Sequence, residues 1–238
     1  MRSKKFPDTA PTSDYAAGVP LAAGHGFPSL DAGNPIVFLD ISTTTSGMGG
    51  HNHRPKETRL FIELLANVNP LLARNFYAFC TGEFTRVVAG RDAPCGYKDS
   101  FFFDAEPGRS LTGGDVITKN GASNVSSLQV PGAAKLSIPP LITKLPSAAT
   151  SCCCGWVYAV ATAAGTAGSQ FRMTFPGDVL PQDLSGVIGR MVVRAGPAAL
   201  DDVAAVLAVL QECTKHVWSA QRGAAHAAYP AVVLCGEM

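Results

Sequence analysis

Short apolar runs separated by turn residues set the pattern of this chain. The first run, residues 36–41 (IVFLDI), is rich in β-branched and aromatic residues, which favour strands. Further runs of this kind lie at residues 59–65, 101–103, 156–162, 170–175, 187–193 and 231–235. The glycines of residues 113–117 (GGDVI) predict a close backbone approach that leads into another short strand. The pattern therefore predicts a mainly β fold.

Two segments show helical spacing instead. Asn69 and Pro70 suit the cap and first turn of a helix, apolar residues follow along one face, and Gly82 suits its end. Residues 197–210 predict a second helix, with an apolar face and acidic residues near its N-terminus. Many short strands with two widely separated helices predict a closed antiparallel β-barrel capped by two α-helices.

The remaining segments lack periodicity. Residues 1–33 are rich in proline, glycine, alanine and serine, which predicts an extended or disordered N-terminal extension. The folded domain is therefore expected over residues 34–238. Segments rich in turn residues or without periodicity are predicted to be extended loops, and they are residues 43–58, 84–95, 119–150 and 214–230.

The bulk composition narrows the functional classes. Hydrophobic residues make up 47% and charged residues 16% of the 238 residues, which suffices for a sizeable core. The formal net charge is +1, so charge gives no support to nucleic-acid binding. No apolar stretch has the length of a membrane span, and the N-terminus lacks the apolar run of a secretory signal. We expect an intracellular, cytoplasmic protein that is neither secreted nor membrane-bound.

Cysteines and histidines leave alternatives to weigh. The seven cysteines, with Cys152–Cys154 in a row, show no zinc-ligand spacing, which favours reduced thiols over a metal or redox site. His51 and His53 lie in a glycine-rich segment without an acidic or cysteine partner at useful spacing, which favours a solvated loop over a metal site. We expect no metal and no cofactor.

Several short motifs follow one another within residues 34–238. They are NPIVFLDI at 34–41, RLFIEL at 59–64, NF…CTGE at 75–83, GYKDS at 96–100, PG…GGD at 107–115, NG at 120–121, GSQF at 168–171 and VIGRMV at 187–192. In this order they resemble the cyclophilin family of peptidyl-prolyl cis-trans isomerases. The resemblance implies a cyclophilin-like barrel and a role in isomerising proline peptides during protein folding. It does not extend to residues 1–33.

The resemblance also locates an active site. Prolyl isomerisation faces a barrier of roughly 20 kcal/mol. The family is thought to lower it with an arginine that donates to the prolyl nitrogen. Here the corresponding position, three residues before Pro107, is Asp104. A carboxylate cannot donate, and losing one well-placed donor typically costs about 10²–10³ in rate. No intact catalytic residue is therefore expected.

The rest of the proline-binding groove differs from the family as well. Its positions correspond to Arg109, Ser110, Thr112, Val160, Ala161, Gln170, Arg172, Leu180, Pro181 and Ser185. Only Gln170 keeps the family's residue. Arg109 and Arg172 replace aromatic residues, and we predict that one or both pair with Asp104 and fill the pocket. The alternative is that both point to solvent, where an ion pair contributes little.

The framework motifs match the family, whereas the groove positions do not. We therefore predict a cyclophilin-like protein with a degenerate isomerase site, bound to a protein partner or a multi-protein assembly. Two alternatives stay open. One is an active or weakly active isomerase that assists protein folding. The other is a weak binder of proline-containing peptides without turnover, against which Arg109 and Arg172 argue.

Overall fold

The computed structural model describes residues 33–43, 57–88, 91–128, 136–137, 153–162, 165–175, 186–194, 199–223 and 229–238. The predicted N-terminal extension, apart from Gly33, lies outside these residues, as do His51, His53 and Cys152. All statements on the structure below concern the described residues.

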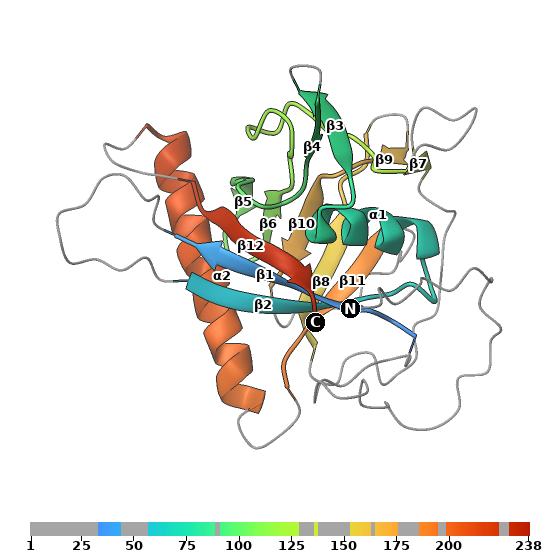
Figure 1. The fold of residues 1–238 in the computed structure, drawn as a ribbon. Helices are drawn as coiled ribbons and strands as arrows, with labels where there is room; N and C mark the ends of the chain where they lie inside the picture. The colour runs from blue at the N-terminus through green and yellow to red at the C-terminus, as the bar shows by residue number, and fades with distance from the viewer. Residues whose placement is uncertain are drawn as a thin grey trace.

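Eight strands form one curled antiparallel sheet (Figure 1). In spatial order they are β12 (Ala231–Glu237), β1 (Ile36–Ser42), β2 (Glu57–Leu64), β11 (Val187–Val192), β8 (Cys153–Ala159), β10 (Phe171–Thr174), β6 (Ser110–Gly113) and β5 (Phe102–Glu106). The outer strands approach each other through a bridge between Phe101 and Ala231, next to a 2.9 Å hydrogen bond from Val232 N to Ser100 O. The mainly β, barrel-like fold is confirmed, although this last seam is not fully paired.

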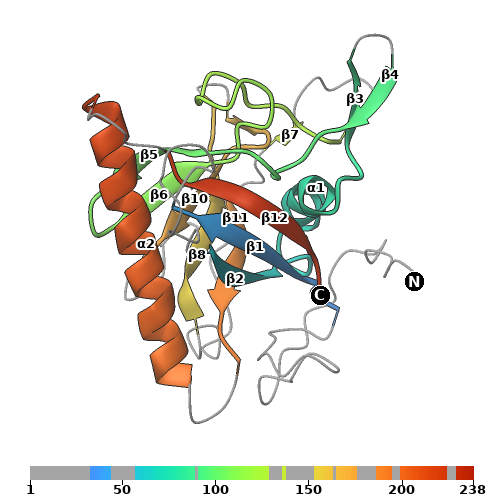
Figure 2. The ribbon, with the colours of Figure 1, turned by 60° about the vertical axis from the view of Figure 1, so that its left-hand side comes forward.

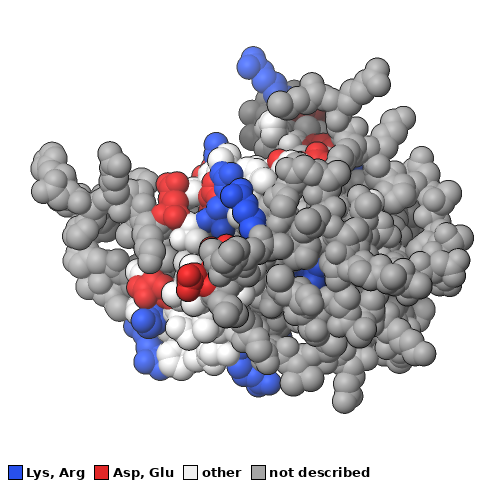
Figure 3. Space-filling view, turned by 90° about the horizontal axis from the view of Figure 1, so that it is seen from below, with Lys and Arg blue, Asp and Glu red and all other residues white. Residues whose placement is uncertain are grey.

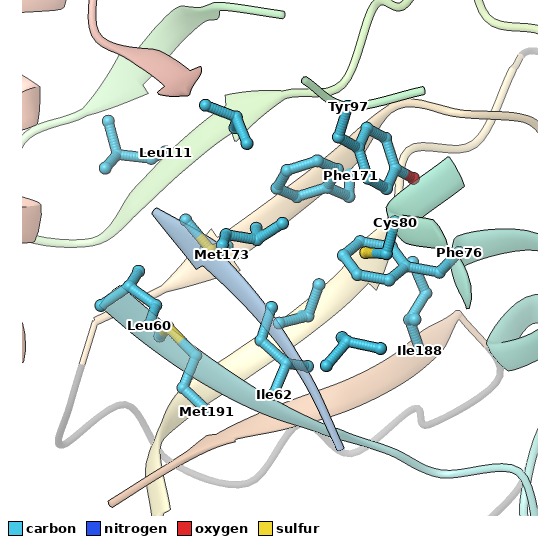
Figure 4. Packing of buried hydrophobic residues seen from close by; sticks show 14 of the residues in the cluster. Leu60, Ile62, Phe76, Cys80, Tyr97, Leu111, Phe171, Met173, Ile188 and Met191 are labelled. Atoms are coloured by element: carbon cyan, nitrogen blue, oxygen red, sulfur yellow. The ribbon is translucent and has the colours of Figure 1, made fainter. Parts of the chain in front are cut away.

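The inside of the curled sheet is one apolar core (Figure 4). Leu60 and Ile62 of β2 and Phe171 and Met173 of β10 are at most 1% exposed. Each pair is two residues apart because successive side chains of a strand point to opposite faces. Phe76 packs edge-on against Phe171, with ring centroids 5.2 Å apart. On β10, Arg172 lies between Phe171 and Met173, so it points outward and is available for a surface site.

Helix α1 (Pro70–Thr81) has the predicted bounds. Proline opens it, and Gly82 ends it in the left-handed conformation at φ 73°. Asn69 does not cap it through its side chain as predicted. Its amide instead donates to Val187 O at 2.7 Å, because the helix start is packed against the beginning of β11. This contact ties α1 to the barrel.

Helix α2 (Ala199–Gln221) is longer than predicted. The prediction of a loop from residue 214 is wrong, since the helix continues to Gln221. Leu210, Cys213 and Val217 are fully buried at helical spacing, so packing carries the helix past the predicted end. Figures 1 and 2 show α2 on the opposite side of the barrel from α1. No helix in the described part of the chain combines the length and apolarity needed to cross a membrane.

Two small strand pairs and one shifted strand also differ from the prediction. The segment 84–95 is a hairpin of β3 (Thr85–Val88) and β4 (Arg91–Pro94), which projects from the barrel (Figure 2). Within the predicted loop 119–150, β7 (Leu136–Ser137) pairs with β9 (Thr166–Ala167). The short strand expected at the double glycine lies before it, as β6, and not after it. The reason is that Gly114 adopts φ 87° and turns the chain.

The close backbone approach predicted at the double glycine is confirmed and can be tested. A Cβ on Gly114 would lie 2.6 Å from Ser169 O and from a ring carbon of Phe171. We expect Gly114→Ala to lower the free energy of unfolding by about 2–3 kcal/mol, measured by urea denaturation. Gly82→Ala is the control, because its φ is also positive but nothing lies within 4 Å. It should cost about 1 kcal/mol. Equal losses would contradict the close contact.

Candidate functional site

Three of the predicted site positions, Asp104, Thr112 and Arg172, lie on the outer face of the sheet, in a row that spans four strands. Thr112 of β6 lies opposite Asp104 of β5 on one side and Arg172 of β10 on the other. Tyr158 of β8 lies opposite Arg172 and ends the row. Since neighbouring strands are about 4.8 Å apart, the four Cα atoms span about 14 Å. Strand pairing thus brings together residues that are distant in sequence. We call this row with its neighbours the outer groove.

A second row lies beside the first, with Ser110 of β6 between Glu106 of β5 and Thr174 of β10. Ser110 and Thr112 are 4% and 5% exposed, so the floor of the outer groove carries buried hydroxyl groups. Asp104 and Glu106 are exposed on one side of this floor, and Arg172 is exposed on the other. Among the described residues, the groove therefore has an acidic and a basic side over a polar floor.

The predicted pairing of Asp104 with an arginine is wrong. Among the described residues, neither Arg109 nor Arg172 forms an ion pair with it, and both arginines are exposed. Thr112 separates Asp104 from Arg172 by two strand spacings. Gln221, at the end of α2, reaches Asp104 instead and donates from Nε2 to its carboxylate at 3.3 Å. The same Nε2 donates to Phe103 O at 3.1 Å. The unexpected length of α2 therefore decides what Asp104 contacts.

Gln170, the groove residue shared with the family, is 7% exposed and engaged within the chain. Its Nε2 donates to Gly121 O at 2.8 Å and to Ser123 O at 3.1 Å. Its backbone N–H donates to Asn124 Oδ1 at 2.8 Å. Both amide hydrogens of the side chain are thereby used to hold the segment that follows the double glycine. Gln170 therefore holds that segment in place through hydrogen bonds.

Two asparagines that sequence reasoning did not single out as site residues complete this frame. Asn124 donates from Nδ2 to Val160 O at 3.1 Å, and Asn75 of α1 donates from Nδ2 to Gly168 O at 2.8 Å. Asn75 Oδ1 also accepts from the backbone N–H and the hydroxyl of Ser127, at 2.8 and 2.9 Å. Their signal in the sequence is weak, because a buried polar residue is recognisable only once its partners are known.

Asp115 fixes the turn beside the outer groove. Its buried carboxylate accepts backbone N–H groups from Ile117 at 3.0 Å, Thr118 at 2.8 Å, Gly121 at 2.9 Å and Ser123 at 3.2 Å. It also accepts the Thr118 hydroxyl. Burial raises the pKa of Asp115, but the hydrogen bonds from Thr118, Ser123 and Ile117 outweigh it and lower the pKa to about 2.

The low pKa of Asp115 predicts a pH dependence of stability. Because the folded-state pKa lies below the unfolded value of about 3.9, the stabilisation is present above pH 4 and is lost as the pH falls towards about 2. Urea denaturation of the wild type and Asp115→Asn between pH 2 and pH 6 measures it. We expect the gap between the two proteins to close as the pH falls through this window. A constant gap would contradict the ionised state of Asp115.

The remaining predicted positions are less informative. Val160 is half-buried and Ala161 is exposed, directly after β8. The positions expected on the rim, Leu180, Pro181 and Ser185, lie outside the described residues. Within the described ranges, no three His, Cys, Asp or Glu side chains gather into a possible metal site. On the face shown in Figure 3, basic and acidic side chains are interspersed, so the described surface there carries no extended basic patch.

The comparison with known proteins finds similarity over part of the chain. No family model matches it. A protein of Mycosarcoma maydis named peptidyl-prolyl cis-trans isomerase D is 33% identical over 94 residues, which cover 40% of this chain and 22% of that protein. Peptidyl-prolyl cis-trans isomerase 11 of Caenorhabditis elegans is 33% identical over 93 residues, covering 39% and 44%. The chain thus spans less than half the length of each of these relatives.

Proposed function

We propose that this chain has a degenerate prolyl isomerase site and acts as a binding or structural component of a larger assembly. The proposal starts from the support that the fold and the two relatives give to a cyclophilin-type family. The position of Asp104 carries this proposal. It occupies the position of the family's donating arginine and is exposed on the outer face of β5. Its carboxylate accepts a hydrogen bond from the side-chain amide of Gln221. A carboxylate there disfavours the electron density that develops on a twisting prolyl nitrogen.

The rest of the outer groove supports the same proposal. A proline ring needs an apolar floor, whereas the floor positions here are Ser110 and Thr112, which are almost fully buried. Arg172 stands where an aromatic wall is expected from the family. Gln170 would hold the peptide backbone in the family, but here its side-chain amide donates to the carbonyl oxygens of Gly121 and Ser123. Among the described groove positions, the groups that would act on a proline peptide are replaced or engaged, while the hydrogen-bonded frame around Gln170 is formed.

A protease-coupled assay with a proline peptide tests the proposal. We expect turnover at least about 10²-fold below that of an intact cyclophilin measured in parallel, without inhibition by cyclosporin. Titration with the same peptide should show no saturable binding. Cyclosporin-sensitive turnover at the level of the intact enzyme would refute a degenerate site. Purification of the full chain from its native source, with its associated proteins, tests the assembly. Recovery of the chain as a lone monomer would refute that part.

An active or weakly active isomerase that assists protein folding is the second candidate. The names of both relatives favour it, together with the intact frame around Gln170 and Asp115. The two candidates differ in one measurable quantity, the cyclosporin-sensitive part of the turnover.

We also propose a protein partner in a reducing compartment such as the cytoplasm. Among the described residues, five cysteines are free thiols, namely Cys80, Cys95, Cys154, Cys213 and Cys235. Burial raises the pKa of Cys213 to about 12 and that of Cys235 to about 11, which keeps both in the unreactive thiol form. Free thiols, four of them buried, suit a compartment in which disulfides do not form. Immunolocalisation of the full chain tests this placement.

A further inference from the structure

The β3–β4 hairpin is anchored at its base and exposed along its length. Phe84 packs edge-on against Phe79 of the core, with ring centroids 5.2 Å apart, and Cys95 N donates to Phe84 O at 2.8 Å. Beyond this base, the two strands pair only with each other within the described structure. Figures 1 and 2 show them standing clear of the barrel. A two-stranded ribbon without a further strand or a packed face is only marginally stable in water.

The register of the hairpin tells which backbone groups point away from it. Phe84 and Cys95 form a hydrogen-bonded pair, and such pairs alternate with non-bonded pairs in an antiparallel ladder. The pairs Thr85–Pro94 and Val87–Asp92 are therefore non-bonded, so their N–H and C=O groups point outward. On β3, both Thr85 and Val87 offer an N–H and a C=O. On β4, proline has no N–H, which leaves that edge a single donor. The edge of β3 is thus the better template for another strand.

The side chains of the hairpin divide by charge. Residues that pair directly share a face, as do alternate residues of one strand. Arg86 pairs with Ala93, two residues from Arg91, so both arginines lie on one face. Val87 and Asp92 pair with each other and lie on the other face. Both arginines are exposed, and Val87 is 67% exposed. Lys119 lies near the basic face, since burial raises the pKa of Cys95 while the charges of Arg86 and Lys119 oppose that rise. One face therefore attracts acidic groups, and on the other Val87 offers an exposed apolar side chain beside Asp92.

We propose that the edge of β3 binds an extended protein segment as a third strand, in which acidic side chains alternate with apolar ones. The acidic side chains would face Arg86 and Arg91, and the apolar ones would cover Val87. Strand addition of this kind takes affinity from backbone hydrogen bonds and specificity from alternate side chains. A nucleic acid fits less well, because it offers no strand to complete the ladder. This proposal does not depend on the outer groove, which lies on other strands.

Binding of a peptide of alternating valine and aspartate to the full chain tests the proposal on the native protein. Isothermal titration should show saturable binding, and a peptide of the same composition with the acidic residues grouped together should bind about tenfold more weakly. In antiparallel pairing the valine amides face β3. A peptide N-methylated at its valines should therefore fail to bind, whereas one N-methylated at its aspartates should bind like the parent. Equal binding of both methylated peptides, or binding of none of the peptides, would overturn the proposal.

A matched pair of proline variants tests it from the protein side. Val87→Pro removes the outward N–H of β3 without touching the bonds of the ribbon, and Asp92→Pro does the same on β4. We expect Val87→Pro to weaken the parent peptide about tenfold and Asp92→Pro to change it less than about twofold. Circular dichroism checks that both variants fold. Equal losses would overturn the assignment to β3. A dimer of the chain alone that Val87→Pro dissociates would overturn the peptide as occupant in favour of a second copy.

Discussion

Replacing Arg190 by alanine is expected to lower the free energy of unfolding by about 3–5 kcal/mol, the largest effect on stability that the fold predicts. Arg190 of β11 and Glu63 of β2 are both fully buried, and Nε donates to the carboxylate at 2.8 Å. Asn34 donates from Nδ2 to the other carboxylate oxygen at 2.9 Å. Removing the guanidinium leaves a carboxylate in the interior without its countercharge, and the loss of that charge pair accounts for the cost.

The control is the replacement of both ionic partners by methionine. Two apolar side chains of similar volume leave no buried charge, so the double variant should be more stable than Arg190→Ala, with a loss below about 2 kcal/mol. Urea denaturation followed by fluorescence suits the test, because Trp156 lies opposite Arg190 in the sheet. If the double variant were as unstable as the single one, packing and not charge would explain the loss.

The strands that form apolar runs were predictable, and the hairpin was not. Residues 36–41 are nearly all buried, with Val37, Leu39 and Ile41 in the main core, and this burial corresponds to an apolar run that the sequence displays. The β3–β4 hairpin buries no face, and its polar strands are held by their own ladder, so nothing in the periodicity marks them. The second half of α2 was not predicted for a different reason. The helix continues because Leu210, Cys213 and Val217 pack into the core. This tertiary packing outweighs the weak helix propensity of the local sequence.

The outer groove was predictable only through the family resemblance. The order of motifs placed Asp104 and Arg172 at one site, and strand pairing through Thr112 joins them. Whether they touch depends on the distance across two strands and on the reach of Gln221 from the end of α2. Neither this distance nor this reach can be derived from the local sequence. The predicted ion pair failed for this reason, although both residues lie in the predicted groove.

Restoring a donor and an aromatic wall to the outer groove is expected to create measurable isomerase activity. Asp104→Arg with Arg172→Phe should raise kcat/KM for a proline peptide by about 10² over the wild type, because one placed electrostatic donor contributes about that factor. Asp104→Arg alone should gain less. Its guanidinium would stand two strands from Arg172, where two positive charges repel and no aromatic ring receives the proline.

Two controls separate the donor from the wall. Arg172→Phe alone supplies the ring without a donor, so peptide affinity should rise while kcat stays at background. Asp104→Lys with Arg172→Phe supplies a positive charge without the planar fork of arginine, and its activity should fall between these limits. The protease-coupled assay gives kcat/KM, and titration with the peptide gives the affinity. If the donor and wall together restored peptide binding without turnover, then the loss of activity would reside elsewhere in the groove, where Arg109, Ser110 and Thr112 are among the positions that still differ from the family.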